Sequence, residues 1–160
     1  MANSTFNGPV RSENGFQSIS KSSTTGAVTS TMTLRTYEAT ITVANGATTG
    51  KESAVGIPAN FIPMGVTVAV TTASTNSVNL NDIGTDADTD GYVDGISAAL
   101  NTTGFKGFFG CNGVLGMSGF TTASSGLVGD EVELVVSGDP GSDTVIVLKF
   151  FGISSSSDAS

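Results

Sequence analysis

The sequence predicts an all-β fold: an antiparallel β-sandwich that carries an extended N-terminal arm. Its 160 residues suffice for one domain with a core. Serine, threonine, asparagine and 21 glycines make up most of the polar residues, and only six residues are basic, a composition typical of strands and turns. Several short segments alternate apolar and polar residues between turn signals. Jelly-roll-like and immunoglobulin-like topologies both fit this strand count and spacing.

Residues 1–33 are predicted to form the arm. They are rich in serine, threonine, asparagine and glycine, and hold neither a helical nor a strand period for long. A disordered leader would have the same composition, so that alternative stays open. Isolated apolar side chains on a polar strip suit pockets on a partner. The residues expected to bind a partner are Phe6, Val10, Arg11, Phe16 and Ile19.

The sandwich domain is predicted to span 34–153, with a flexible tail at 154–160. Its first strand, 36–44, alternates and ends at an Asn45-Gly46 turn. The residues of this strand expected to face the core are Tyr37, Ala39, Ile41 and Val43. A short strand within 52–65 is expected to be ended by its two prolines, Pro58 and Pro63.

Three further segments follow in the middle of the chain. Residues 65–73 alternate, with Val66, Val68 and Val70 expected to face inward. Residues 77–84 form a strand candidate that leads into an aspartate-rich segment. Residues 95–100 fit either one helical turn or another strand.

Residues 131–153 form the clearest hairpin candidate. Val132, Leu134 and Val136 alternate toward the core, and GDPG supplies the turn. The same alternation places Glu131 and Glu133 on the solvent face. The return strand is apolar on both faces, so we expect it to be buried on both sides or to contact another subunit.

Glycine recurs at every third position through 104–119. The stretch contains no proline, which argues against a collagen helix, and it lacks the strand–GxGxxG–helix context of a dinucleotide loop. We interpret it as a bulged strand and a wide loop. Its three phenylalanines either cap the core, which is favoured, or meet a neighbouring subunit. The candidate oligomer contacts are Phe105, Phe108, Phe109, Phe150 and Phe151.

The segment GTDADTDGYVDG, 84–95, resembles a calcium loop. Its spacing matches an EF-hand start, with Gly91 at the sixth position, but the twelfth position holds Ser97 instead of a bidentate glutamate. Clustered carboxylates repel one another unless a cation joins them. A solvated acidic turn is the favoured alternative. The candidate calcium ligands are Asp86, Asp88, Asp90, Tyr92 (through its carbonyl) and Asp94.

The charge pattern argues against nucleic-acid and membrane partners. The net charge is −8, whereas phosphate binding needs clustered lysine and arginine. Residues 1–36 hold three basic residues and one acidic one, and residues 37–160 hold three basic and thirteen acidic ones. A weakly basic segment therefore precedes a strongly acidic body. The opening residues lack the apolar core of a secretory signal, so we expect synthesis in a cytoplasm.

Catalysis is not expected. The chain has no histidine, which removes the commonest general base and most zinc sites. Cys111, the single cysteine, has no imidazole to activate it and is interpreted as a small buried apolar residue. Carboxylate pairs can hydrolyse glycosides, but the chain offers no tryptophan platform for a sugar. No cofactor is expected apart from the candidate structural calcium.

Two stretches carry a family resemblance. The opening MANSTFNGPVRSENGFQSIS resembles the N-termini of small virion structural proteins in tailed phages of marine cyanobacteria and related marine bacteria. IPANFIPMGVTVAVTTA, followed by VNLNDIGTDADTDGYVDGI, is similar to a module of small head-associated β-sandwich proteins of phages. The resemblance covers roughly the first hundred residues.

This resemblance implies a capsid decoration (cement) protein or a neighbouring head or tail component. Its partners would be the major capsid protein and copies of itself, often in a homotrimer on the capsid surface. The arm would reach onto the lattice, so deleting residues 1–25 should abolish capsid binding and leave the sandwich folded. The alternatives are a calcium-stabilised adhesion module, such as a fibre tip or carbohydrate-binding sandwich, and a tail or neck ring subunit.

Overall fold

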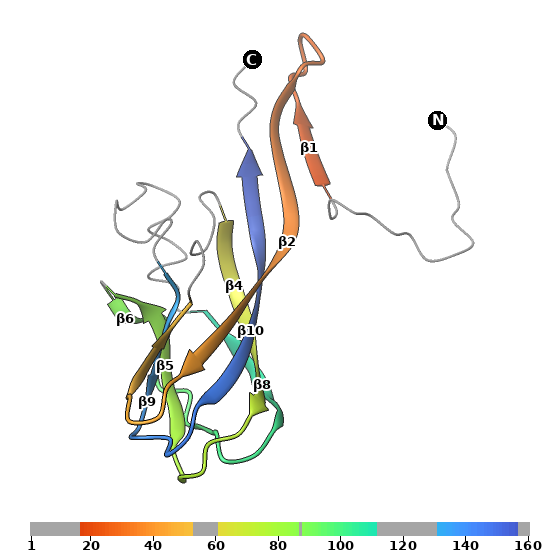
Figure 1. Ribbon diagram of the computed structural model, residues 1–160. Coiled ribbons are helices and arrows are strands. Elements are labelled where there is room, and N and C mark those ends of the chain that lie inside the picture. The colour runs from red at the N-terminus through yellow and green to blue at the C-terminus, as the bar shows by residue number, and fades with distance from the viewer. Residues whose placement is uncertain (1–16, 53–60, 87, 112–130, 157–160) are drawn as a thin grey trace, which may run out of the picture.

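The computed structural model describes residues 17–52, 61–86, 88–111 and 131–156 (Figure 1). Within these ranges the chain forms no helix, and two antiparallel sheets pack face to face, which confirms the predicted β-sandwich. The strands are β1 (Gln17–Lys21), β2 (Val28–Val43), β3 (Thr49–Lys51), β4 (Phe61–Thr72), β5 (Asn79–Thr85), β6 (Asp88–Val93), β7 (Ala98–Ala99), β8 (Gly104–Gly110), β9 (Glu133–Val136) and β10 (Thr144–Ser156).

The strand order is that of a jelly roll. Sheet A has the order β1-β2-β10-β4-β8, and sheet B has the order β3-β9-β5-β6, with β7 paired to β5. The antiparallel pairs therefore include β2 with β10, β3 with β9, β4 with β8 and β5 with β6. The first half of the chain pairs with the second half, as in a long hairpin rolled into two sheets. Immunoglobulin sandwiches divide their strands differently, so the order selects one of the two expected topologies.

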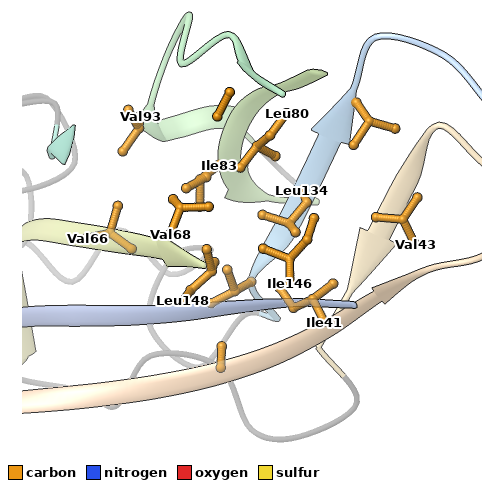
Figure 2. Packing of buried hydrophobic residues seen from close by; sticks show 14 of the residues in the cluster. Ile41, Val43, Val66, Val68, Leu80, Ile83, Val93, Leu134, Ile146 and Leu148 are labelled. Atoms are coloured by element: carbon orange, nitrogen blue, oxygen red, sulfur yellow. The ribbon is translucent and has the colours of Figure 1, made fainter. Parts of the chain in front are cut away.

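The core lies between the two sheets and is built by strand alternation. Every second residue of the central strands points inward, as the sequence of 36–44 and 65–73 predicts. Tyr37 is half-buried at the edge of this core. Core residues without exposed surface are Ala39, Ile41, Val43, Val66, Val68, Leu80, Ile83, Leu100, Val132, Leu134, Ile146, Leu148 and Phe150. Figure 2 shows the packing of part of this cluster, including Ile41, Leu80 and Leu148.

The predicted hairpin at 131–153 is wrong in its pairing. Val132, Leu134 and Val136 do face the core, but β9 pairs with β3 and β5 in sheet B, whereas β10 pairs with β2 and β4 in sheet A. The GDPG segment therefore passes from one sheet to the other. Local alternation and a turn signal cannot distinguish a hairpin from such a crossing, because both need the same residues. Glu133 is also buried, at 6% exposure, and not on the solvent face.

Two other segments refine the predicted elements. Pro63 lies inside β4, and not at a strand end. β4 carries an irregularity beside it, because Phe151 pairs with Gly65 and Gly152 with Pro63, which leaves Met64 without a partner on β10. A bulge is one of the few places where a sheet tolerates proline. Pro58 lies outside the described residues. Residues 98–99 form strand β7, so 95–100 contains a strand and no helical turn.

The two ends of the jelly roll differ. At one end, which we call the closed end, the connections are tied together by two aspartates. Asp139 Oδ1 accepts hydrogen bonds from the backbone N–H groups of Gly46 and Gly141, both at 2.8 Å. Asp143 Oδ1 accepts one from Asn45 N at 2.9 Å. Pro140 O accepts two more, from Thr75 N and Asn76 N.

From the opposite end projects a β-ribbon, which we define as β1, the turn at 22–27, residues 28–33 of β2 and residues 154–156 of β10 (Figure 1). Gln17 pairs with Thr33 and Lys21 with Val28, so β1 runs outward toward the tip of the ribbon. The turn at the tip is closed by Ser22, whose backbone carbonyl accepts a hydrogen bond from Gly26 N at 2.9 Å. β2 continues without a break through the predicted boundary at 33/34.

Candidate interaction surface

The outer face of sheet A carries exposed aromatic side chains beside β8. Paired residues of an antiparallel sheet project to the same side. Phe105 pairs with Ala69, and Phe108 pairs with Thr67, which are the outward positions of β4. Val147 pairs with Ala69 from the other side. The outer patch, as we define it, consists of Phe105, Phe108, Phe151, Ala69 and Val147.

Gly65 allows two of these rings to meet. The Phe108 and Phe151 ring centroids are 5.2 Å apart, with the planes tilted by 35°. A Cβ built on Gly65 would lie 2.3 Å from Phe108 Cζ and 2.8 Å from Phe151 Cε1. Real atoms do not approach so closely, so the two rings lie over the glycine, in the space that a side chain would occupy. Glycine is required here for close approach and not for an unusual backbone angle.

The patch is exposed to an unusual degree. Phe105 is 68% exposed and Phe108 is 52% exposed. Leu34 and Met64 are the other large apolar residues of comparable exposure in the described ranges. Two neighbouring exposed phenylalanines on one face are uncommon on monomeric proteins and typically mark an interaction site.

The five phenylalanines predicted to contact another subunit lie on different faces of sheet A. Phe105, Phe108 and Phe151 lie on the outer face, whereas Phe109 pairs with Val66 and packs against the core. Phe150 has no exposed surface and contacts Tyr92 edge-on, at a centroid distance of 5.5 Å. Its side chain is therefore unavailable to another subunit.

The aspartate-rich segment is a hairpin. β5 and β6 pair antiparallel, and the last pair before the turn is Thr85 with Asp88. Gly84 allows β6 to cross closely, because a Cβ there would lie 2.0 Å from the Asp88 carbonyl oxygen. Asp86 forms an ion pair with Lys51 at the end of β3. Residues 88–93 of the predicted acidic turn are therefore a strand of sheet B.

The carboxyl groups in and beside this hairpin have pKa values that are shifted in opposite directions. The bond to Lys51, followed by one with Glu133, lowers the pKa of Asp86. Burial, followed by the hydrogen bond with Asp86, raises the pKa of Glu133. A hydrogen bond with Asp90 raises the pKa of Asp88. Lys51 therefore favours the ionised form of Asp86, whereas the carboxylate neighbours of Asp88 and Glu133 disfavour theirs.

The candidate calcium ligands are not gathered into one site in the part of the chain that is described. No three side chains of aspartate, glutamate, cysteine or histidine converge there in an arrangement suited to a metal ion. Asp86 pairs with Lys51, and the Tyr92 ring is buried against Phe150. Asp94 lies exposed at the end of β6. Calcium binding through this segment stays a prediction.

A second polar contact closes the sandwich at the ribbon end. Tyr37 Oη donates a hydrogen bond of 2.7 Å to Glu52 Oε2, and Glu52 is only 6% exposed. Burial, followed by this bond, raises the pKa of the Tyr37 hydroxyl. The bond joins β2 of sheet A to the residue that follows β3 of sheet B. Sequence alternation places Tyr37 inward but gives no sign of this partner.

Of the arm residues predicted to bind a partner, Ile19 lies in β1, where it pairs with Thr31. Phe6, Val10, Arg11 and Phe16 lie outside the described residues. Cys111 follows β8, is half-buried, and donates its backbone N–H to Met64 O. Burial raises the pKa of its thiol to about 12, which agrees with an unreactive structural cysteine.

The glycine pattern predicted a bulged strand, and 104–110 confirms it. Gly104 and Gly107 have φ values of +110° and +155°, and the pairing of β8 with β4 shifts between Val68 and Ala69. Lys106 occupies the extra position and donates a hydrogen bond to Thr102 Oγ1. The remaining glycines of the repeat lie outside the described residues.

Comparison with known proteins supports the fold. No protein-family model matches the chain, and no curated protein matches its sequence. A chain from a solved structure described as the Cyanophage Pam1 capsid asymmetric unit is similar in fold, with a TM-score of 0.50 and 14% sequence identity. The match covers 93% of both chains, so the two are of similar length. No helix of the described residues is long and apolar enough to cross a membrane.

Proposed function

We propose that this chain is a non-enzymatic structural protein of a phage virion, and specifically a decoration protein on the head surface. The observation that carries the proposal is the likeness to a chain of a cyanophage capsid, which spans nearly the whole of both chains. A jelly roll alone is compatible with many functions, so the proposal depends on that match together with the surface of this chain.

The surface supports a role in assembly. The outer patch exposes apolar rings in a chain with few exposed large apolar residues in its described ranges. The net charge of −8 favours the outside of a capsid over contact with packaged nucleic acid. The arm, residues 1–33, would attach the subunit to the major capsid protein and to neighbouring copies, with the subunits associated as a homotrimer.

Purified virions provide the test. The chain should be present at a fixed copy number, and antibodies against the closed end should label the head in electron micrographs. Add-back to particles that lack the chain should restore full occupancy with the intact protein but not with a variant without residues 1–25. Labelling of the neck or tail would instead identify the chain as a ring subunit of that structure. Absence of the chain from the virion would refute the proposal.

A further inference from the structure

We propose that the outer patch binds residues 1–16 of a second copy of this chain. This proposal deepens the self-association within the proposed function and rests on it. The two exposed rings, Phe105 and Phe108, present on the order of 200 Å² of aromatic surface to solvent. The two lysines beside them are already engaged, Lys149 with Glu38 at 2.9 Å and Lys106 with Thr102. Because most of its exposed area is aromatic and the Lys149 charge is paired, such a surface favours an apolar occupant.

The patch also lies beside an open sheet edge. β8 ends the order of sheet A and, in the described chain, pairs only with β4. An edge strand offers unpaired N–H and C=O groups to an added strand, and a patch beside it offers side-chain contacts. The preferred occupant is therefore an extended segment with apolar side chains on one face.

Residues 1–16 have that pattern. Apart from Met1, their largest apolar residues are Phe6, Val10 and Phe16, which are separated by four and six positions. Even spacing places all three side chains on the same face of an extended chain. The opposite face carries polar residues and proline: Asn7, Pro9, Arg11 and Glu13.

Sheet order favours the arm of another copy over the chain's own. β1 and β8 are the two edges of sheet A, so four strand spacings, ~19 Å, separate them. Phe16 is the residue before β1, so chain connectivity keeps it within ~3.5 Å of the first residue of that strand. The chain's own Phe16 therefore cannot reach β8, so an arm that places all three apolar residues along the patch must come from another copy. An arm passed to the next subunit makes a head-to-tail contact, which closes into a ring when the rotation permits.

Photo-crosslinking in the purified full-length protein tests this inference without capsids. In unlabelled copies of the chain, Phe6 is replaced by the photo-crosslinker benzoylphenylalanine. These copies are mixed in denaturant with ¹⁵N-labelled copies and refolded together. Circular dichroism checks that the fold is regained. We expect cross-links to 104–110 in both labelled and unlabelled peptides. A probe at Asn7, on the opposite face, is the control and should cross-link there much less. Cross-links only within unlabelled copies, or none at the patch, would overturn the inference.

Variants of the patch give an independent measurement. Phe105→Ser with Phe108→Ser should raise the dissociation constant for self-association about tenfold or more, as expected for loss of aromatic anchors. Gly65→Ala should also weaken it, because the new Cβ would displace the Phe108 ring. Leu34→Ser, at a residue 51% exposed on β2, is the matched control and should leave association unchanged. Unchanged association in the patch variants would contradict the inference, whereas capsid labelling tests the proposed function separately.

Discussion

The two adjacent phenylalanines of β10 offer a sharp test of the fold. Phe150 has no exposed surface, and its ring lies between Tyr92, at 5.5 Å, and Tyr37, at 6.4 Å. Phe151 points to the opposite face and is half-exposed. Phe150→Ala removes a whole ring from a closed core, which costs about 4 kcal/mol, including the lost aromatic contacts. Phe151→Ala removes one surface ring contact and should cost about 1 kcal/mol.

Urea unfolding at one fixed protein concentration measures both variants. The chain has no tryptophan and two tyrosines, and both tyrosines contact Phe150, so tyrosine fluorescence and near-ultraviolet dichroism report on this site. At about 2 to 4 °C per kcal/mol, Phe150→Ala should lower Tm by about 8 to 16 °C. A loss below about 2 kcal/mol, or equal losses in the two variants, would refute the assignment of the two faces. Fixed concentration matters because association adds to stability.

Three further predictions follow. Gly84→Ala should destabilise the fold strongly, because its Cβ would lie 2.0 Å from a backbone oxygen, whereas Gly138→Ala, with nothing nearer than 3.7 Å, should not; thermal melting compares the two. Hydrogen bonds from Gly141 and Gly46 lower the pKa of Asp139. Its contribution to stability is therefore present above its unfolded pKa, about 4, and is lost as the pH falls through the lower folded value. Unfolding measured at several pH values should show that Asp139→Asn loses less stability in acid than the unchanged protein. The favoured solvated-turn interpretation predicts that calcium leaves Tm unchanged relative to chelator, since Lys51 already pairs with Asp86. A rise in Tm that grows with calcium concentration would instead support the calcium-loop interpretation.

The sequence predicts the parts of this fold that depend on neighbouring residues. Alternation along 36–44 and 65–73 identifies the inward side chains, because strand geometry makes every second residue equivalent. It cannot show which strands pair. The residues of β9 and β10 are those of a hairpin, yet they lie in different sheets, because the order of a jelly roll is decided by contacts between distant strands.

The interaction surface was predictable only in part. The sequence identifies the phenylalanines of 104–110 as a group. Because Lys106 interrupts the alternation at the bulge, the pattern does not separate outward Phe105 and Phe108 from inward Phe109. Gly65 gave no signal at all. Its role depends on Phe108 and Phe151, which approach it from two different strands.

The charges of the two sheet faces suggest how the subunit is oriented in an assembly. Around the β5–β6 hairpin, sheet B carries Asp86, Asp88 and Asp90 with a single lysine partner at Lys51. On sheet A, the Lys149–Glu38 pair is internally neutral and lies beside the outer patch. Burying carboxylates that outnumber the cations beside them is costly in an interface, whereas burying aromatic surface is favourable. We therefore expect the outer patch at the β8 edge of sheet A to face the neighbouring subunit and the acidic hairpin to face solvent. Replacing Asp90 with lysine should then leave self-association unchanged, and introducing a carboxylate by Ala69→Asp within the patch should abolish it.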